Sequence, residues 1–164
     1  MQQAFAGQAD TPPTADFADF AAAAARVRAS FDRQAAMRLI GARLERVEPG
    51  CVEIALPFRP DIAQQHGFAH AGIIGAALDS ACGFAAYSLM PQDTGVLTVE
   101  FKLNLLAPGA GREFRLIGRV RKAGRTITVA EGEAWAIRDE GTRKLIATMT
   151  GTLMTVRDRD GIQG

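Results

Sequence analysis

Asp79 is the residue whose position most strongly suggests chemistry. It is the only charged residue between His70 and Asp93, and it lies in an Ala-rich apolar run that predicts an interior helix over about residues 71–89. A carboxylate in such surroundings must be hydrogen-bonded, lie at a cleft or take part in chemistry, because burying it unpaired is costly. With an ordinary pKa of about 4, an aspartate is ionised at pH 7 and can act as a base or a nucleophile. The alternative is a structural carboxylate, hydrogen-bonded to backbone where the helix packs against another element.

The loop before this helix carries a second group of polar side chains. Residues 61–70 show neither helical nor strand periodicity, and they contain Gln64, Gln65, His66 and His70. Ala71 and Gly72 then open the helix, and free N–H groups at a helix start favour negative charge. Ala71 and Gly72 therefore form a candidate oxyanion site. A histidine in such a loop is more often a structural hydrogen-bonding group than a catalyst.

The spacing of these two candidates predicts a dimer. Ala71 and Asp79 are eight positions apart, about 12 Å along a helix, so one small carbonyl group cannot lie beside both. If both take part, two copies of the helix must lie antiparallel, each contributing its Asp79 to the other's N-terminus. Close pairing requires a helix face with little side-chain bulk, and the face around Asp79 consists of Gly72, Gly75, Ala76, Cys82, Gly83 and Ala86. The sequence therefore predicts a two-fold dimer with two composite sites.

Hydrophobic periodicity predicts the elements that hold these groups in place. They are a helix over 14–36, two strands around a Pro49-Gly50 turn, the helix over 71–89 and four strands between Gly95 and Val156. In the first of those four strands a set of apolar residues alternates with polar ones: Leu97, Val99, Phe101, Leu103 and Leu105. An antiparallel sheet curled around one apolar helix buries both, which is an α+β layout. We expect one domain over 14–156, a mobile tail over 1–13 and a polar tail over 157–164.

Composition and charge narrow the class of protein. Of 164 residues 48% are hydrophobic, and 19 basic residues nearly balance 18 acidic ones, so we expect no nucleic-acid partner. The sequence has no apolar run of roughly 20 residues and no signal-peptide pattern, so we expect a cytoplasmic protein without a membrane partner. Neither Cys51 nor Cys82 has metal-ligand spacing, and no metal is expected. Residues 112–125 hold six basic side chains against Glu113 alone, which indicates a solvated sheet face or a phosphate-binding patch.

Three segments together resemble the hotdog-fold acyl-CoA thioesterases, with the PaaI-like group the most similar branch. They are HGFAHAGIIGAALDSACGFAA, TVEFKLNLLAPG and RKAGRT, and the resemblance covers roughly residues 40–156. It implies a hotdog fold, in which an antiparallel sheet wraps around a central hydrophobic helix. It also implies hydrolysis of an acyl-CoA to a carboxylic acid and free CoA by a homodimer with composite active sites, and a homotetramer built from such dimers.

The resemblance assigns roles in the reaction position by position. Asp79 falls on the acidic catalyst of the family, acting as a general base on water or directly as a nucleophile. Ala71 falls on the amide that polarises the thioester carbonyl, with Gly72 beside it, and Gln64 falls on the assisting amide side chain. Many relatives have His-Gly-Gly where this chain has His70-Ala71-Gly72. Alanine keeps the backbone N–H, and its Cβ narrows the approach.

The same resemblance implies supporting and binding roles for other residues. His70 holds the loop and the helix start, and Thr98 positions water. The CoA phosphates lie along Arg121, Lys122 and Arg125. The resemblance calls for no cofactor, because coenzyme A arrives as part of the substrate.

Two other functions fit the same residues. A hotdog acyl-CoA hydratase or dehydratase needs a histidine–acid pair at the reacting carbons. His66 or His70 would supply the histidine of that pair. A non-catalytic acyl-CoA sensor would keep the pocket and bind without turnover. The acyl group itself is not specified, because Phe68, Phe84, Tyr87 and Met90 fit either a pocket lining or core packing.

Overall fold

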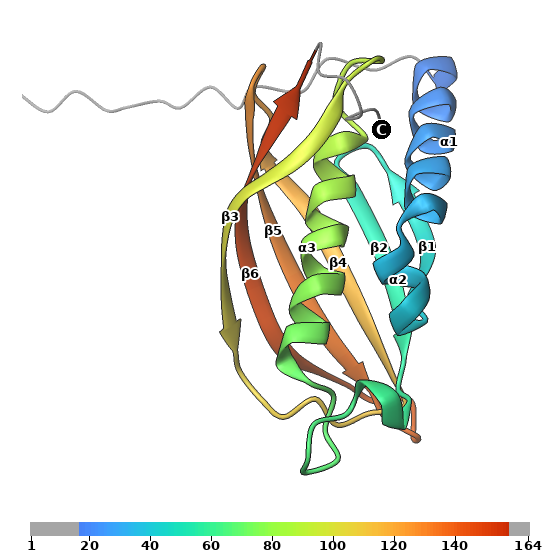
Figure 1. Ribbon diagram of the computed structural model, residues 1–164, viewed down its shortest axis with the longest axis vertical. Helices are drawn as coiled ribbons and strands as arrows, with labels where there is room; N and C mark the ends of the chain where they lie inside the picture. The colour runs from blue at the N-terminus through green and yellow to red at the C-terminus, as the bar shows by residue number, and fades with distance from the viewer. Residues whose placement is uncertain (1–16, 158–164) are drawn as a thin grey trace, which may run out of the picture.

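The computed structural model describes residues 17–157 and contains a six-stranded antiparallel sheet with helices along one side (Figure 1). The strands lie in the order β1-β2-β4-β5-β6-β3. The helices are α1 (Phe17–Arg33), α2 (Ala35–Ile40), the 3₁₀ turn η1 (Pro60–Ile62) and α3 (Ala71–Tyr87). The strands are β1 (Arg43–Glu48), β2 (Cys51–Pro57), β3 (Gly95–Leu105), β4 (Glu113–Lys122), β5 (Ile127–Ile137) and β6 (Arg143–Val156). The expected α+β hotdog layout, a sheet around one apolar helix, is confirmed.

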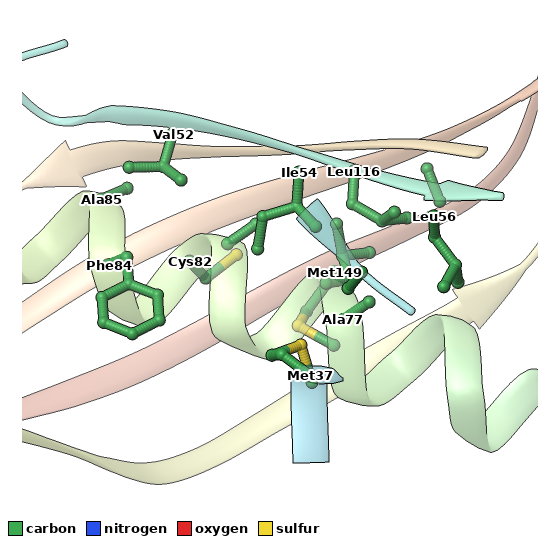
Figure 2. Packing of buried hydrophobic residues seen from close by; sticks show 14 of the residues in the cluster. Met37, Val52, Ile54, Leu56, Ala77, Cys82, Phe84, Ala85, Leu116 and Met149 are labelled. Carbon is green, nitrogen blue, oxygen red and sulfur yellow. The ribbon is translucent and has the colours of Figure 1, made fainter. Parts of the chain in front are cut away.

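The core lies between α3 and the sheet. One side of α3 is fully buried and faces apolar side chains from several strands, as Figure 2 shows for Ala77, Cys82, Ala85, Ile54, Leu116 and Met149. Contact is closest at Gly118 of β4, where a Cβ atom would overlap the carbonyl group of Ala81. Glycine at this position therefore allows the helix backbone to lie directly on the sheet. This contact sets the distance between α3 and the sheet. It therefore also sets the position of the groups on the opposite side of α3.

The N-terminal helical region differs from the single helix expected over 14–36. The helix breaks at Gln34, whose ψ of 93° is extended, and α2 then runs to Ile40. The break allows Met37 and Ile40 of α2 to be buried in the core. Residues 14–16 and the tail over 1–13 lie outside the described residues, as do 158–164 of the expected C-terminal tail. The central helix ends at Tyr87, two residues before the expected boundary.

A β-bulge changes the alternation expected in β3. The pairing with β6 shifts between Thr98 and Glu100, so Val99 is the extra residue. The bulge brings Thr98 to the same side of the sheet as Leu103, the side that faces α3. Strict alternation would have placed Thr98 on the opposite side from Leu103. The bulge therefore decides that a hydroxyl group faces the helix at this point.

The two edges of the sheet differ in how they are covered. Helix α1 packs beside β1, whereas β3 forms the opposite edge with no further strand next to it in residues 17–157 (Figure 1). Four apolar side chains of β3 are between 39% and 58% exposed: Leu97, Val99, Phe101 and Leu105. None of the helices in the described part of the chain has the length and apolar character that crossing a bilayer requires.

Candidate active site

The start of α3 presents one free backbone N–H group. His70 is the N-cap residue, and its Nδ1 accepts a hydrogen bond from the Gly72 N–H at 3.0 Å. The His70 carbonyl accepts from Ile73 and Ile74. Within residues 17–157 the Ala71 N–H has no acceptor. Of the two amides expected at this end, only that of Ala71 is available to a ligand, since His70 occupies that of Gly72.

Ala71 lies at the wall of a cavity of about 510 Å³. The loop over 61–70 and the first turn of α3 form one side, and the segment from Leu105 to Gly109 forms the other. Gln64 also lines it, and its Oε1 accepts a hydrogen bond from the His66 N–H. That bond fixes the side chain and leaves its Nε2 as a donor. The cavity therefore combines apolar walls with an amide side chain and the free N–H of Ala71.

Asp79 lies further along α3, half-buried beside a second, smaller cavity of about 80 Å³. The Thr98 hydroxyl of β3 donates a hydrogen bond of 2.8 Å to Asp79 Oδ1. Burial raises the pKa of Asp79 above its ordinary value of 3.8, and the Thr98 hydrogen bond partly opposes that shift. The ordinary pKa expected from the sequence is therefore wrong. A base whose pKa lies nearer the operating pH is a stronger proton acceptor when ionised.

The structure brings the predicted site residues together in two groups rather than one. Gln64, His70 and Ala71 gather at the larger cavity, and Asp79 and Thr98 meet at the smaller one. Eight residues of helix, about 12 Å, separate the Ala71 N–H from the Asp79 backbone. Within a single chain these two groups of residues therefore lie apart on one helix.

Gln34 and Ser80 are polar residues near Asp79 that the sequence analysis did not identify. The Ser80 hydroxyl donates to Gln34 Oε1 at 3.3 Å, and both side chains line the smaller cavity. Cys82, one turn from Asp79, is not a nucleophile at neutral pH, because burial and the Asp79 charge raise the pKa of its thiol to about 12. Gln34 lies 45 residues before Asp79, so no local spacing in the sequence relates the two.

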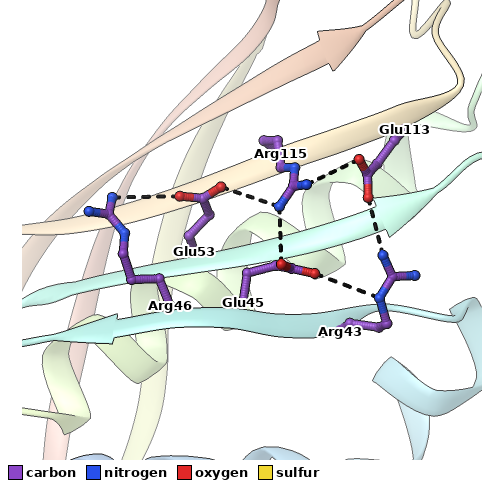
Figure 3. A network of polar contacts seen from close by, with 6 residues as sticks. All are labelled: Arg43, Glu45, Arg46, Glu53, Glu113 and Arg115. Carbon is purple, nitrogen blue, oxygen red and sulfur yellow. Dashed lines mark hydrogen bonds and ion pairs between the residues drawn. The ribbon is translucent and has the colours of Figure 1, made fainter.

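The basic residues do not form one patch. Arg115 pairs with Glu45, Glu53 and Glu113 in a network on the outer face of β1, β2 and β4 (Figure 3). Arg121 pairs with Glu131 at 3.2 Å. Lys122 and Arg125 are exposed where β4 turns into β5, at the end of the sheet near the C-terminus of α3. Within one chain the proposed CoA-binding residues and the cavity at Ala71 therefore lie at opposite ends of α3.

The side chains that fit either a pocket lining or core packing divide between the cavities and the core. Phe84 lines the smaller cavity and Phe68 the larger one, whereas Tyr87 and Met90 are core residues. Neither histidine hydrogen-bonds to a carboxylate in the described part of the chain, so the pair that a hydratase needs is not formed there. Among residues 17–157 no three His, Cys, Asp or Glu side chains are grouped as metal ligands would be.

Comparison with known proteins identifies the family of this chain. The family model of the thioesterase superfamily matches residues 66–142. A thioesterase family protein from Silicibacter pomeroyi is 50% identical, with 82% of this chain and 98% of that one covered and a TM-score of 0.81. A mutant of the phenylacetic acid degradation protein PaaI from Thermus thermophilus is 27% identical, with coverage of 72% and 96% and a TM-score of 0.62.

A third structure shares the fold at lower identity. The PaaI protein of Escherichia coli, from the phenylacetic acid degradation operon, is 18% identical over 82% of this chain and 93% of that one, with a TM-score of 0.72. The matched family residues, 66–142, include Ala71, Asp79 and Thr98. The chain belongs to the thioesterase superfamily of hotdog-fold hydrolases, and it is similar to the PaaI structures within it.

Proposed function

We propose that this protein hydrolyses acyl-CoA thioesters at a site built from two chains. The observation that carries the proposal is the pair of half-sites on α3, a free N–H at Ala71 and a carboxylate at Asp79, each beside a cavity. The Ala71 N–H of one chain polarises the thioester carbonyl, and Asp79 of the other either activates the water that attacks the carbonyl carbon or attacks that carbon itself. The tetrahedral oxyanion collapses with loss of the CoA thiolate, which then takes up a proton.

Asp79 can perform this reaction in two ways. As a general base it takes a proton from water, whose oxygen then attacks the carbonyl carbon. As a nucleophile it attacks directly and forms an anhydride, which water hydrolyses. In both cases the carboxylate must be ionised, and the Thr98 hydroxyl holds it in place.

The geometry of α3 supports the two-chain arrangement. If Asp79 meets the partner's Ala71 in an antiparallel pair, the two-fold axis passes near the residue midway between them, Gly75. The helix has little side-chain bulk near Gly75, because Gly72 and Ala76 are small and exposed. A Cβ at Gly75 would meet only a Leu103 methyl group, at 3.3 Å. Two such helices can approach closely.

The free edge of the sheet supports the same arrangement. A β3 strand pairing with its two-fold copy would cover its unpaired backbone groups and its exposed apolar side chains. The antiparallel arrangement also carries the partner's Lys122 and Arg125 past the loop over 61–70, where the CoA phosphates would extend. We therefore propose a homodimer as the active unit; the expected homotetramer and the cytoplasmic location stay predictions.

Mixing two inactive variants tests the composite site. Asp79→Asn removes the carboxylate, and Ala71→Pro removes the one free N–H. If each site takes one group from each chain, a mixed dimer has one site with both defects and one site with neither. After random reassociation of equal amounts, about a quarter of wild-type activity per chain should return. The measurement is the release of free thiol from an acyl-CoA by unfolded and co-refolded mixtures.

Two controls make the result decisive. Each variant refolded alone should stay inactive, and a double variant carrying both changes should gain nothing when it is mixed with either single variant. If both groups acted within one chain, every site in the mixed dimer would carry one defect. Absence of recovery in a mixture that contains mixed dimers would therefore contradict the two-chain site.

Thr98→Val should shift the acid limb of the activity profile to higher pH. The hydroxyl hydrogen-bonds the charged form of Asp79 and lowers its pKa, so removing it raises the pKa further above 3.8. The ionised fraction of Asp79 then falls at each acidic pH. The measurement is kcat/KM against pH. Thr152→Val is the matched control, because the Thr152 hydroxyl bonds Glu100 instead; a limb that does not move in Thr98→Val would contradict the role of Asp79.

A further inference from the structure

The cavity beside Asp79 continues along α3 away from the carboxylate. Its walls come from three elements: Val96 and Thr98 on β3, Gly83 and Phe84 on α3, and Gln34 at the break between α1 and α2. Gly83 is four residues after Asp79, so both lie on the same face of the helix, about 6 Å apart along the axis. A group entering beside the carboxylate therefore meets Gly83 one helical turn deeper.

The position where a Cβ of Gly83 would stand is empty in the described chain. The residue is buried, yet no atom outside its own helix backbone and chain neighbours lies within 4 Å of where its Cβ would stand. Within a helix, glycine is less stabilising than alanine. On the sheet side of this packing, by contrast, Gly118 excludes a Cβ by direct overlap with Ala81. Nothing in the described chain excludes one at Gly83.

Gln34 contributes the part of the cavity wall that comes from the break between α1 and α2. Its side chain is free to do so because it makes no helix-capping hydrogen bond, although it occupies the N-cap position of α2. The Ser80 hydroxyl instead fixes its Oε1 at 3.3 Å. Gln34, at the break between α1 and α2, is therefore held in the cavity wall by Ser80, the residue that follows Asp79 on α3.

The volume selects the size of ligand. About 80 Å³ is roughly half the volume of the 150 Å³ apolar cavity known to hold a benzene ring. A propyl group fits, whereas a ring, or a chain of five or more carbons, which is no smaller than a ring, requires Phe84 or Gln34 to move.

On the basis of the proposed function, we propose that this cavity is the acyl subsite, that Gly83 sets its depth, and that the substrates are acyl-CoAs with short aliphatic acyl groups. The thioester carbonyl lies at Asp79, and the acyl chain extends along α3 toward Gly83. The empty volume at Gly83 is then the space that the end of the acyl chain occupies.

The experiment compares Gly83→Ala and Gly83→Val with wild type over acetyl-, butanoyl-, hexanoyl-, decanoyl- and benzoyl-CoA. Wild type should prefer the butanoyl substrate. In Gly83→Ala the ratio of kcat/KM for butanoyl-CoA to that for acetyl-CoA should fall by about tenfold or more, and further in Gly83→Val. Thermal unfolding should show a higher Tm for Gly83→Ala, because alanine favours the helix. A loss of one substrate together with a gain in stability is not expected of a residue with only a structural role.

Gly151→Ala is the matched control. A Cβ there would meet ordinary contacts at 3.6 Å, and the residue does not line the cavity, so the substrate ratio should not change. The proposal is overturned if wild type prefers hexanoyl-, decanoyl- or benzoyl-CoA, or if Gly83→Ala lowers all substrates equally. It is also overturned if Gly83→Ala weakens the dimer in sedimentation, which would assign the space to the partner chain. If wild type hydrolyses none of the five, the proposed function fails as well.

Discussion

Asp79→Asn should lower kcat for acyl-CoA hydrolysis by about 10²–10⁴-fold. An amide cannot accept a proton from water or form the anhydride, so both versions of the reaction are lost. The geometry should survive, because an amide oxygen can still accept the hydrogen bond that the Thr98 hydroxyl donates. Steady-state release of free thiol measures the loss, and sedimentation checks that the oligomeric state is unchanged.

The same variant should not lose stability at neutral pH. Because burial raises the pKa of Asp79, the folded state binds more protons than the unfolded state between pH 3.8 and that raised value. The free energy of unfolding therefore falls as pH rises through this interval, and the ionised carboxylate costs stability above it. Asp79→Asn removes that cost, so its urea midpoint at pH 7 should equal or exceed that of wild type. Clear destabilisation with retained activity would instead identify Asp79 as a structural carboxylate.

Ala71→Pro should lower kcat by about 10²–10³-fold, the usual effect of losing one oxyanion donor. Proline is tolerated at the first position of a helix, where its missing N–H has no helical partner. The preceding residue is already suitable, since His70 has an extended ψ of 132°. The substitution therefore removes one N–H with little change in backbone. Circular dichroism and Tm should match wild type within the effect of ordinary surface substitutions.

Ala71→Gly is the control for this variant. It keeps the N–H and restores the His-Gly-Gly pattern of many relatives, so its kcat should stay within a few-fold of wild type. If Ala71→Pro were as active as Ala71→Gly, the amide at this position would not hold the oxyanion. The larger cavity would then bind substrate without polarising its carbonyl.

The sequence predicts the strands and the central helix well because their signals are local. Period-two alternation bounded by turn residues such as Pro49-Gly50 marks strands that pair with their neighbours in the chain. The Ala-rich run around Asp79 marks a helix that has to be interior. Asp79 itself could be singled out because one charge in an apolar helix requires an explanation, and the structure places it at a cavity.

What the sequence does not predict depends on contacts between distant segments. Gln34 is neither glycine nor proline, so nothing local marks the helix break that brings it to Ser80. The bulge that turns Thr98 toward α3 depends on register with β6 rather than on the residues of β3. Arg115 belongs to a basic segment of sequence, yet its glutamate partners Glu45 and Glu53 come from other strands.

The exposed edge strand β3 also affects the risk of aggregation during synthesis and folding in a cell. An uncovered strand of 11 residues with apolar side chains is a template for irregular strand-to-strand association as well as for the proposed pairing with its two-fold copy. Newly synthesised chains that are slow to associate with a second copy would therefore be prone to aggregation. Substitutions that weaken pairing would reduce the yield of soluble protein before any effect on turnover could be measured.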